Sequence, residues 1–301
     1  IENLGSITNT GGATLNNFTD GEIRNEGTFT NEDGATLNIH NIARVFMTGS
    51  FSSFTNTGIT TVVNNDGHFG NDGTFENRDG AVFNNTAEAD FKNSGALTNK
   101  GGATLTFGEG AFSRNGGPGT FSNEGADIKI VDRFTQFENR GTRENSDGAT
   151  LTIGEEARFA SIPSIDVLDA DINDFDFDLF PELIEDGALV NTGTVTNASG
   201  SKVDNAIGGI LLNEDGGALG NAADGVISND GILLNRGDAT SISNEGTFKN
   251  QGAFRNADGA TLSNTGEGSI ENTGTFKILA GSTLDGNGSY LQTGGSLIVD
   301  G

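Results

Sequence analysis

Apolar residues recur along this chain in short units, in which one large apolar residue is followed two positions later by Asn. The stretch GTFTNEDGATLN at residues 27–38 returns as GTFENRDGAVFN at residues 73–84 and as GAFRNADGATLSN at residues 252–264. Alternate side chains of a β-strand face the same way, so this spacing is typical of a strand. Turn residues, usually including Gly, close each unit after six to nine residues, which is too short for a helical repeat. The pattern therefore predicts short strands separated by corners.

The units group in threes, because equivalent apolar positions return every 20 to 25 residues over most of the chain. Three short sides and three corners make one triangular coil, and stacked coils give three parallel sheets around one continuous interior. The sequence predicts an all-β fold, a parallel β-helix (β-solenoid) with about 13 coils of about 22 residues each. At one strand spacing per coil, the rod would be about 60 Å long. We expect residues 1–301 to form a single β-solenoid domain.

Each position of the unit has a physical role. The apolar residue faces inward and stacks on its counterparts, while the Asn that follows is expected to bond to the Asn of the next coil and form an asparagine ladder. Gly supplies the positive φ of a sharp corner. On the third side an apolar residue often replaces the Asn, so that side is expected to bury a second apolar layer; the replacements are Ile39, Phe107, Ile130 and Ile153.

Three inward columns follow from the spacing. The first is expected to include Ile1, Phe91, Phe112, Phe137, Phe159, Val203 and Leu291; the second Phe75, Leu97, Phe121, Arg143, Leu189 and Leu211; the third Val62, Leu105, Leu151 and Val195. Arg143 occupies an apolar position of the second column. Since a buried, unpaired charge is costly, we expect its strand to slip or its side chain to reach Glu144 or Glu138.

The repeat is interrupted once, at residues 161–187, where no corner motif occurs and two of the three prolines lie. We interpret this acidic insertion as an arm that leaves the solenoid at one corner. Within it, Phe175, Phe177 and Leu179 alternate with aspartates, so one face of the arm is apolar. Such a face is expected to cover the solenoid or to contact a partner.

The same arm raises the possibility of a calcium site. Asp169, Asp171 and Asn173 have the one-three-five oxygen spacing of an EF-hand loop, and Asp176 completes the candidate ligand set. However, Asp174 stands where that loop has Gly, and Phe180 where it has a bidentate Glu. Calcium is the one cofactor that the sequence suggests.

Charge and composition narrow the classes of function. Forty-two acidic residues against 16 Lys and Arg give a net charge of −26, which disfavours nucleic acid and anionic membranes as partners. The chain has no Cys, no Trp, one Tyr and two His, which leaves little for a nucleophilic triad or for sugar-stacking platforms. We therefore expect no enzyme, and a polysaccharide-active β-helix enzyme ranks third among the candidate functions.

Ice binding ranks second, because it requires outward Thr in regular ranks on a flat sheet. The expected third side carries such a rank, interrupted by Asp127 and Lys129; its threonines are Thr14, Thr36, Thr61, Thr104, Thr150, Thr194, Thr261 and Thr283. The second side adds Thr28, Thr30, Ser53 and Thr55, with Glu76 among them.

The units GTFTNEDGATLN, GTFENRDGAVFN and GTVTNASG resemble the haemagglutinin-type repeats of bacterial large exoproteins, the filamentous-haemagglutinin and autotransporter-passenger β-helices. The resemblance spans nearly the whole chain except 161–187. It implies a right-handed β-helical shaft, secreted to the cell surface, that adheres or builds an extracellular fibre, and it carries over no catalytic residue. The regular terminal coils favour either stacking of this chain on itself, head to tail, or continuation in a longer chain. The expected partners are therefore the chain itself and a cell-surface or matrix ligand.

Overall fold

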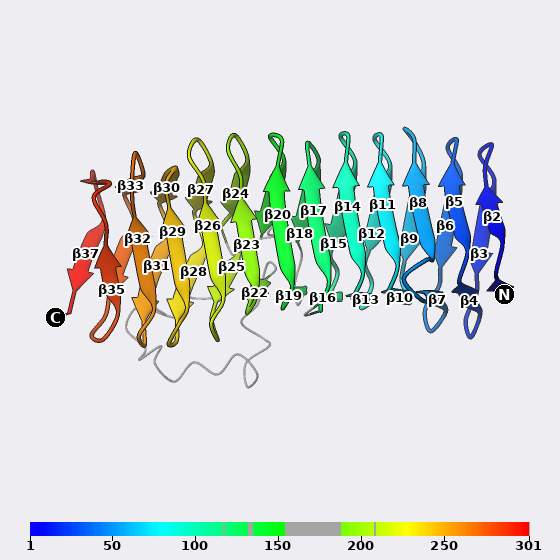
Figure 1. Ribbon diagram of the computed structural model, residues 1–301, viewed down its shortest axis with the longest axis horizontal. Coiled ribbons are helices and arrows are strands. Elements are labelled where there is room, and N and C mark those ends of the chain that lie inside the picture. The colour runs from blue at the N-terminus through cyan, green and yellow to red at the C-terminus, as the bar shows by residue number, and fades with distance from the viewer. Residues whose placement is uncertain (117, 132–134, 154–187, 208, 301) are drawn as a thin grey trace, which may run out of the picture.

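A computed structural model gives the fold of the protein, and it describes residues 1–116, 118–131, 135–153, 188–207 and 209–300. These residues form 37 short strands in three parallel sheets that run the length of an elongated solenoid (Figure 1). Each of 12 successive coils contributes one strand to each sheet and β37 adds a thirteenth strand to sheet A, which confirms the predicted all-β parallel solenoid.

Sheet A has 13 strands: β1 (Glu2–Asn3), β4 (Glu22–Asn25), β7 (Arg44–Met47), β10 (His68–Asn71), β13 (Asp90–Asn93), β16 (Phe112–Asn115), β19 (Gln136–Asn139), β22 (Ala188–Asn191), β25 (Ile210–Asn213), β28 (Ile232–Arg236), β31 (Ala253–Ala257), β34 (Thr275–Ile278) and β37 (Ser296–Val299).

Sheet B has 12 strands: β2 (Ser6–Asn9), β5 (Thr28–Glu32), β8 (Ser53–Thr57), β11 (Thr74–Arg78), β14 (Ala96–Lys100), β17 (Thr120–Glu124), β20 (Thr142–Ser146), β23 (Thr194–Asn197), β26 (Ala218–Asn221), β29 (Ser241–Asn244), β32 (Thr261–Asn264) and β35 (Thr283–Asp285).

Sheet C also has 12 strands: β3 (Thr14–Asn17), β6 (Thr36–Ile39), β9 (Val62–Asn65), β12 (Val82–Asn85), β15 (Thr104–Phe107), β18 (Asp127–Ile130), β21 (Thr150–Ile153), β24 (Lys202–Asn205), β27 (Val226–Asn229), β30 (Thr247–Asn250), β33 (Ser269–Asn272) and β36 (Ser289–Gln292).

The interior is built from stacked columns, as the periodicity predicts. Phe75 of β11 lies directly beside Leu97 of β14 in the sheet, and both side chains are buried. Phe54 stacks on Phe75 with ring centroids 5.2 Å apart. On sheet C, the four apolar residues that replace the corner Asn are all buried, which confirms the second apolar layer; they are Ile39, Phe107, Ile130 and Ile153.

Asparagine ladders line the interior beside these columns. Sheet B carries an unbroken ladder from Asn9 to Asn264, in which each amide nitrogen donates to the amide oxygen of the next coil at 2.7–3.1 Å. The amides also bind the corners: Asn77 donates to the carbonyl oxygen of Ala81 in its own corner at 3.3 Å and to that of Thr104 in the next coil at 2.9 Å. The predicted ladder is therefore present, and it ties the corners to one another along the rod.

Glycine has two distinct uses at the corners. Gly34 has φ +75°, and its neighbour Asp33 also has a positive φ of 54°, so this corner follows the prediction. Gly95 is required for a different reason. A Cβ on Gly95 would lie 2.1 Å from the carbonyl oxygen of Gly73, because successive coils touch there.

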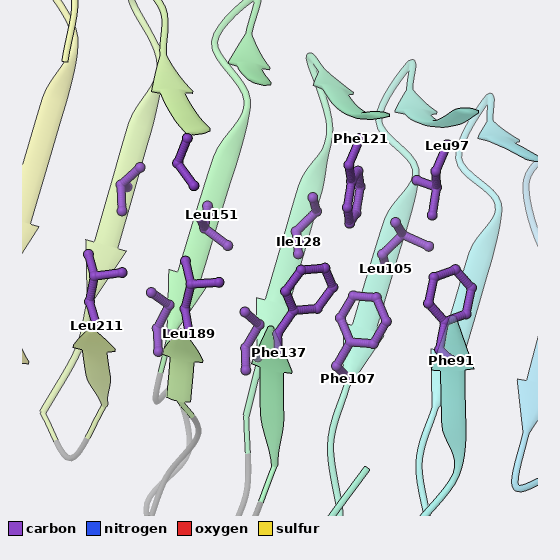
Figure 2. Close-up of a cluster of buried hydrophobic side chains, with 14 of the residues drawn as sticks. Phe91, Leu97, Leu105, Phe107, Phe121, Ile128, Phe137, Leu151, Leu189 and Leu211 are labelled. Carbon is purple, nitrogen blue, oxygen red and sulfur yellow. The ribbon is translucent and has the colours of Figure 1, made fainter. Parts of the chain in front are cut away.

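The predicted columns are wrong in register after the insertion. Leu189 of β22 pairs with Phe137 of β19 in sheet A, whereas the sequence placed it beneath Arg143 (Figure 2). Val195, in turn, pairs with Arg143 in sheet B, and Val203 pairs with Leu151 in sheet C. The chain thus leaves sheet C after Ile153 and re-enters at sheet A, so the count of sides resumes one place earlier than expected.

Three single positions are also corrected. Phe112 faces outward and is 37% exposed, while Ser113 takes the inward place. Val63 rather than Val62, and Tyr290 rather than Leu291, continue the columns of sheet C. In each case the residue two positions later fixes the register, because Asn115, Asn65 and Gln292 take part in ladder hydrogen bonds.

Candidate functional site

The predicted site residues all fall in one segment that lies outside the described residues. These are the calcium candidates Asp169, Asp171, Asn173 and Asp176, the contact residues Phe175, Phe177 and Leu179, and the column residue Phe159. They stay predictions. Among the residues that the structure does describe, no group of three or more His, Asp or Glu side chains is placed to hold a metal ion.

The described part of the chain has no helix long and apolar enough to cross a membrane. The candidate functional surfaces of the described residues are the outer faces of the three sheets. On these faces the outward side chains repeat at about 4.8 Å from coil to coil and about 7 Å along a strand. Each face is a regular two-dimensional array, and its chemistry depends on which residues fill the array.

The outer face of sheet B is rich in hydroxyl groups. Two outward columns run side by side along its strands, and we call their Ser and Thr residues the hydroxyl face. One column is Ser6, Thr28, Ser53, Thr74, Ala96, Thr120, Thr142, Thr194, Ala218, Ser241, Thr261 and Thr283; the other is Thr8, Thr30, Thr55, Glu76, Thr98, Ser122, Glu144, Thr196, Gly220, Ser243, Ser263 and Asp285.

The sequence predicted a rank of threonines on the third side, but these threonines do not all lie on one sheet. Thr194, Thr261 and Thr283 belong to sheet B, because the register shifts at the insertion. Thr61 is buried at a corner, where its hydroxyl accepts a hydrogen bond from the Gly34 amide at 2.9 Å. On sheet C, Val62 continues the outward column after Thr36. Sheet C therefore lacks the regular rank, and sheet B has it.

Ion pairs interrupt the hydroxyl face at β11, the fourth of the twelve strands of sheet B. The Glu76 carboxylate lies 3.0 Å from the Lys100 ammonium and 3.4 Å from the Arg78 guanidinium. Arg78 also contacts Asp79 at 2.8 Å. These four side chains are partly exposed, so the pairs add little stability, but they interrupt the hydroxyl face, as Glu144 does on β20.

A second polar array, which the sequence reasoning missed, lies on the outer face of sheet C. Asn38, Asn64 and Asn84 each donate an amide hydrogen to the Asn of the preceding coil, starting at Asn16, over 2.9, 3.0 and 3.1 Å. The signal in the sequence is a second Asn, directly before the ladder position, in TLNN, VVNN and VFNN. The row presents fixed amide groups to solvent at the N-terminal part of the rod.

Arg143 is the one charged residue among the large, fully buried side chains of the described chain. It stays in register between Phe121 and Val195, so neither the predicted slip nor the predicted contact with Glu144 or Glu138 occurs. Its guanidinium lies 4.8 Å from the Phe121 ring and 4.9 Å from the Phe137 ring. Nε, Nη1 and Nη2 have no hydrogen-bond partner. Burial lowers the pKa of Arg143 to about 9.

The comparisons with known proteins add little to this picture. No protein-family model and no curated protein matches the chain. One solved structure that resembles it is the TibC-catalysed, hyper-glycosylated fragment of TibA, with 12% sequence identity and a TM-score of 0.24. That alignment covers 98% of this chain and 94% of the other. The class of protein, a parallel β-solenoid with interior asparagine ladders, therefore rests on the strands described above.

Proposed function

We propose that the protein is a non-enzymatic, extracellular shaft, which serves as the rigid part of a bacterial surface adhesin or fibre. The observation that supports this most strongly is the unbroken asparagine ladder from Asn9 to Asn264 beside the stacked apolar columns. Every coil is fixed to the next through three sheets and buried amides, so bending would break many hydrogen bonds at once. Such a structure transmits force and holds its outer faces in a fixed array.

The sequence resemblance to haemagglutinin-type repeats supports the same proposal, with a place at the cell surface. Adhesion would use the outer arrays, because hydroxyl and amide groups at fixed spacing form many weak hydrogen bonds to a polar, repetitive ligand. The proposed partners are a cell-surface or matrix ligand and the chain itself, joined head to tail or as part of a longer polypeptide.

Electron microscopy of the purified protein tests the shaft directly. We expect straight rods about 60 Å long, or end-to-end multiples of that length. Globular particles would contradict the proposal. Beads coated with the protein, compared with albumin-coated beads on immobilised polysaccharides and matrix glycoproteins, test the adhesive part. Binding no greater than that of albumin on every surface would leave the shaft without its adhesive function.

Ice binding is the second candidate, and the hydroxyl face of sheet B favours it more than the sequence did. A thermal-hysteresis measurement distinguishes the two functions, since a shaft has no reason to arrest ice growth. If ice is bound, Thr30→Lys with Thr55→Lys would abolish hysteresis, whereas Thr106→Lys on sheet C would leave it unchanged. Absence of hysteresis in the unmodified protein ends this candidate.

A further inference from the structure

The coil formed by β19, β20 and β21 differs from the coils on either side of it. Its inward position on sheet B holds Arg143, whereas Phe121 and Val195 hold the same position in the coils before and after. The guanidinium is buried, and none of its three nitrogens has a hydrogen-bond partner. A buried donor without an acceptor raises the free energy of the closed coil, and the opened coil recovers that cost because water reaches the group. The coil of Arg143 is therefore expected to open more easily than its neighbours.

The asparagine ladder of sheet B is also least tight at this coil. Asn123 donates to Asn145 over 2.7 Å on the side of β17, but Asn145 donates to Asn197 over 3.1 Å on the side of β23. The other rungs of this ladder are 2.7–2.9 Å long. The longest rung thus follows directly after Arg143, so the ladder does not compensate for the unpaired charge.

The packing of the interior changes at the same coil, as Figure 2 shows around Phe137 and Leu151. Ring contacts follow one another from Phe29 to Phe137, with centroids 5.1–5.7 Å apart. Beyond Arg143, the apolar interior residues that the structure describes from Leu151 to Ile242 are all aliphatic. Arg143 contacts the last two rings of the aromatic part and continues neither kind of packing. The interior is therefore discontinuous where the charge lies.

We propose that the coil of Arg143 is a weak point built into the rod, which opens before the coils on either side of it. It divides the described solenoid into two cooperative units, one from β1 to β18 and one from β22 to β37. Stability in a solenoid is approximately the sum of the contacts between neighbouring coils, so a single weak coil limits the cooperativity between its two sides. This inference concerns the fold and does not depend on the shaft function. In a shaft, the same coil would determine where the rod yields under load.

Hydrogen exchange of the full chain, resolved strand by strand, tests the proposal. We expect the protection factors of the β20 amides to be lower by about tenfold or more than those of the equivalent amides in β17 and β26. β17 belongs to the aromatic part of the interior and β26 to the aliphatic part, so the comparison does not depend on the kind of packing. Equal protection in the three strands overturns the proposal.

Two variants show whether the charge itself causes the opening. Arg143→Leu and Arg143→Met both place an apolar side chain in the column, and the long, unbranched Met fills irregular space well. Both are expected to raise the protection of β20 to that of β17. The control Arg44→Leu, at an exposed position of β7, is expected to leave the difference unchanged. If β20 stays equally loose in both Arg143 variants, the buried charge is not the cause and the proposal is wrong.

Discussion

The guanidinium of Arg143 lies 4.8 Å above the ring of Phe121, inside a column that is otherwise apolar. The second ring, that of Phe137, lies 4.9 Å away from the same guanidinium. Cation–π contact offsets part of the desolvation cost, but the donors Nε, Nη1 and Nη2 stay without acceptors. A pKa of about 9 still leaves Arg143 protonated at neutral pH. The coil therefore holds a buried charge whose donors find no hydrogen-bond acceptor among the described residues.

Arg143→Leu is expected to stabilise the protein, because it restores an apolar residue to the column. Replacement of even a buried ion pair by apolar residues of similar volume is often neutral or stabilises by about 1–4 kcal/mol, and Arg143 has no ion-pair partner to lose. Guanidinium unfolding followed by circular dichroism measures the gain. Arg114→Leu is the control, since Arg114 lies on the outer face and pairs with Glu138 at 2.5 Å. A loss of stability in Arg143→Leu would show that the charge has a partner in the folded protein.

The gain from Arg143→Leu is expected to depend on pH. The folded pKa of about 9 is below the ordinary value of an arginine side chain, so between these values the unfolded chain holds a proton that the folded chain has released. The unmodified protein therefore becomes more stable relative to Arg143→Leu as pH rises through 9, by about 1.4 kcal/mol per pH unit. Parallel unfolding curves at pH 7 and pH 10 measure the difference. An equal gain at both values would contradict the lowered pKa.

Asn77→Ala is expected to destabilise the rod strongly, because the Asn77 amide donates to Asn99, Thr104 and Ala81 and accepts from Asn56. Each buried group left unpaired costs about 1–3 kcal/mol.

Asn64→Ala is the matched control for the ladder. Asn64 also stands in a row of amides, but that row is on the outer face, where water replaces the lost bonds. The free energy of unfolding, measured by denaturant titration, should fall clearly for Asn77→Ala and change by about 0.5 kcal/mol or less for Asn64→Ala. Equal effects would mean that the interior ladder contributes no more than surface hydrogen bonds do.

Gly95→Ala is expected to distort the contact between coils, since the new Cβ would lie 2.1 Å from the Gly73 carbonyl oxygen. Gly116→Ala is the control, because its Cβ would lie 3.4 Å from the nearest atom, the Asn93 carbonyl oxygen. Overpacking of this kind costs about 1–3 kcal/mol. Thermal unfolding of both variants checks the prediction, and an unchanged midpoint in Gly95→Ala would contradict close coil contact at this corner.

Calcium binding by residues 161–187 is tested by calorimetric titration. If Asp169, Asp171, Asn173 and Asp176 form a site, the unmodified protein releases or takes up heat on addition of Ca²⁺, and Asp169→Ala with Asp171→Ala loses the signal. Asp33→Ala, at a distant corner, serves as the control. Absence of heat from the unmodified protein ends the hypothesis.

The sequence by itself determined the coil, because the two-residue spacing of apolar residue and Asn admits only one way of facing both inward. That spacing predicted the stacking of Phe75 on Leu97 and the buried layer that contains Phe107 and Ile130. The same spacing predicted the wrong inward residue where a neighbouring position could also face the interior. At Phe112 and Val62 the ladder amides fixed the register, and hydrophobicity did not.

The tertiary structure determined which sheet each strand joins after the insertion. Because the chain re-enters at sheet A, Thr194 joins the hydroxyl face of sheet B, and Leu189 stacks on Phe137. It also decided that Arg143 stays inside, since cooperative pairing along sheet B holds its strand in register despite the buried charge. Local spacing sets which way a side chain points, but only the stacked coils set which residues become neighbours.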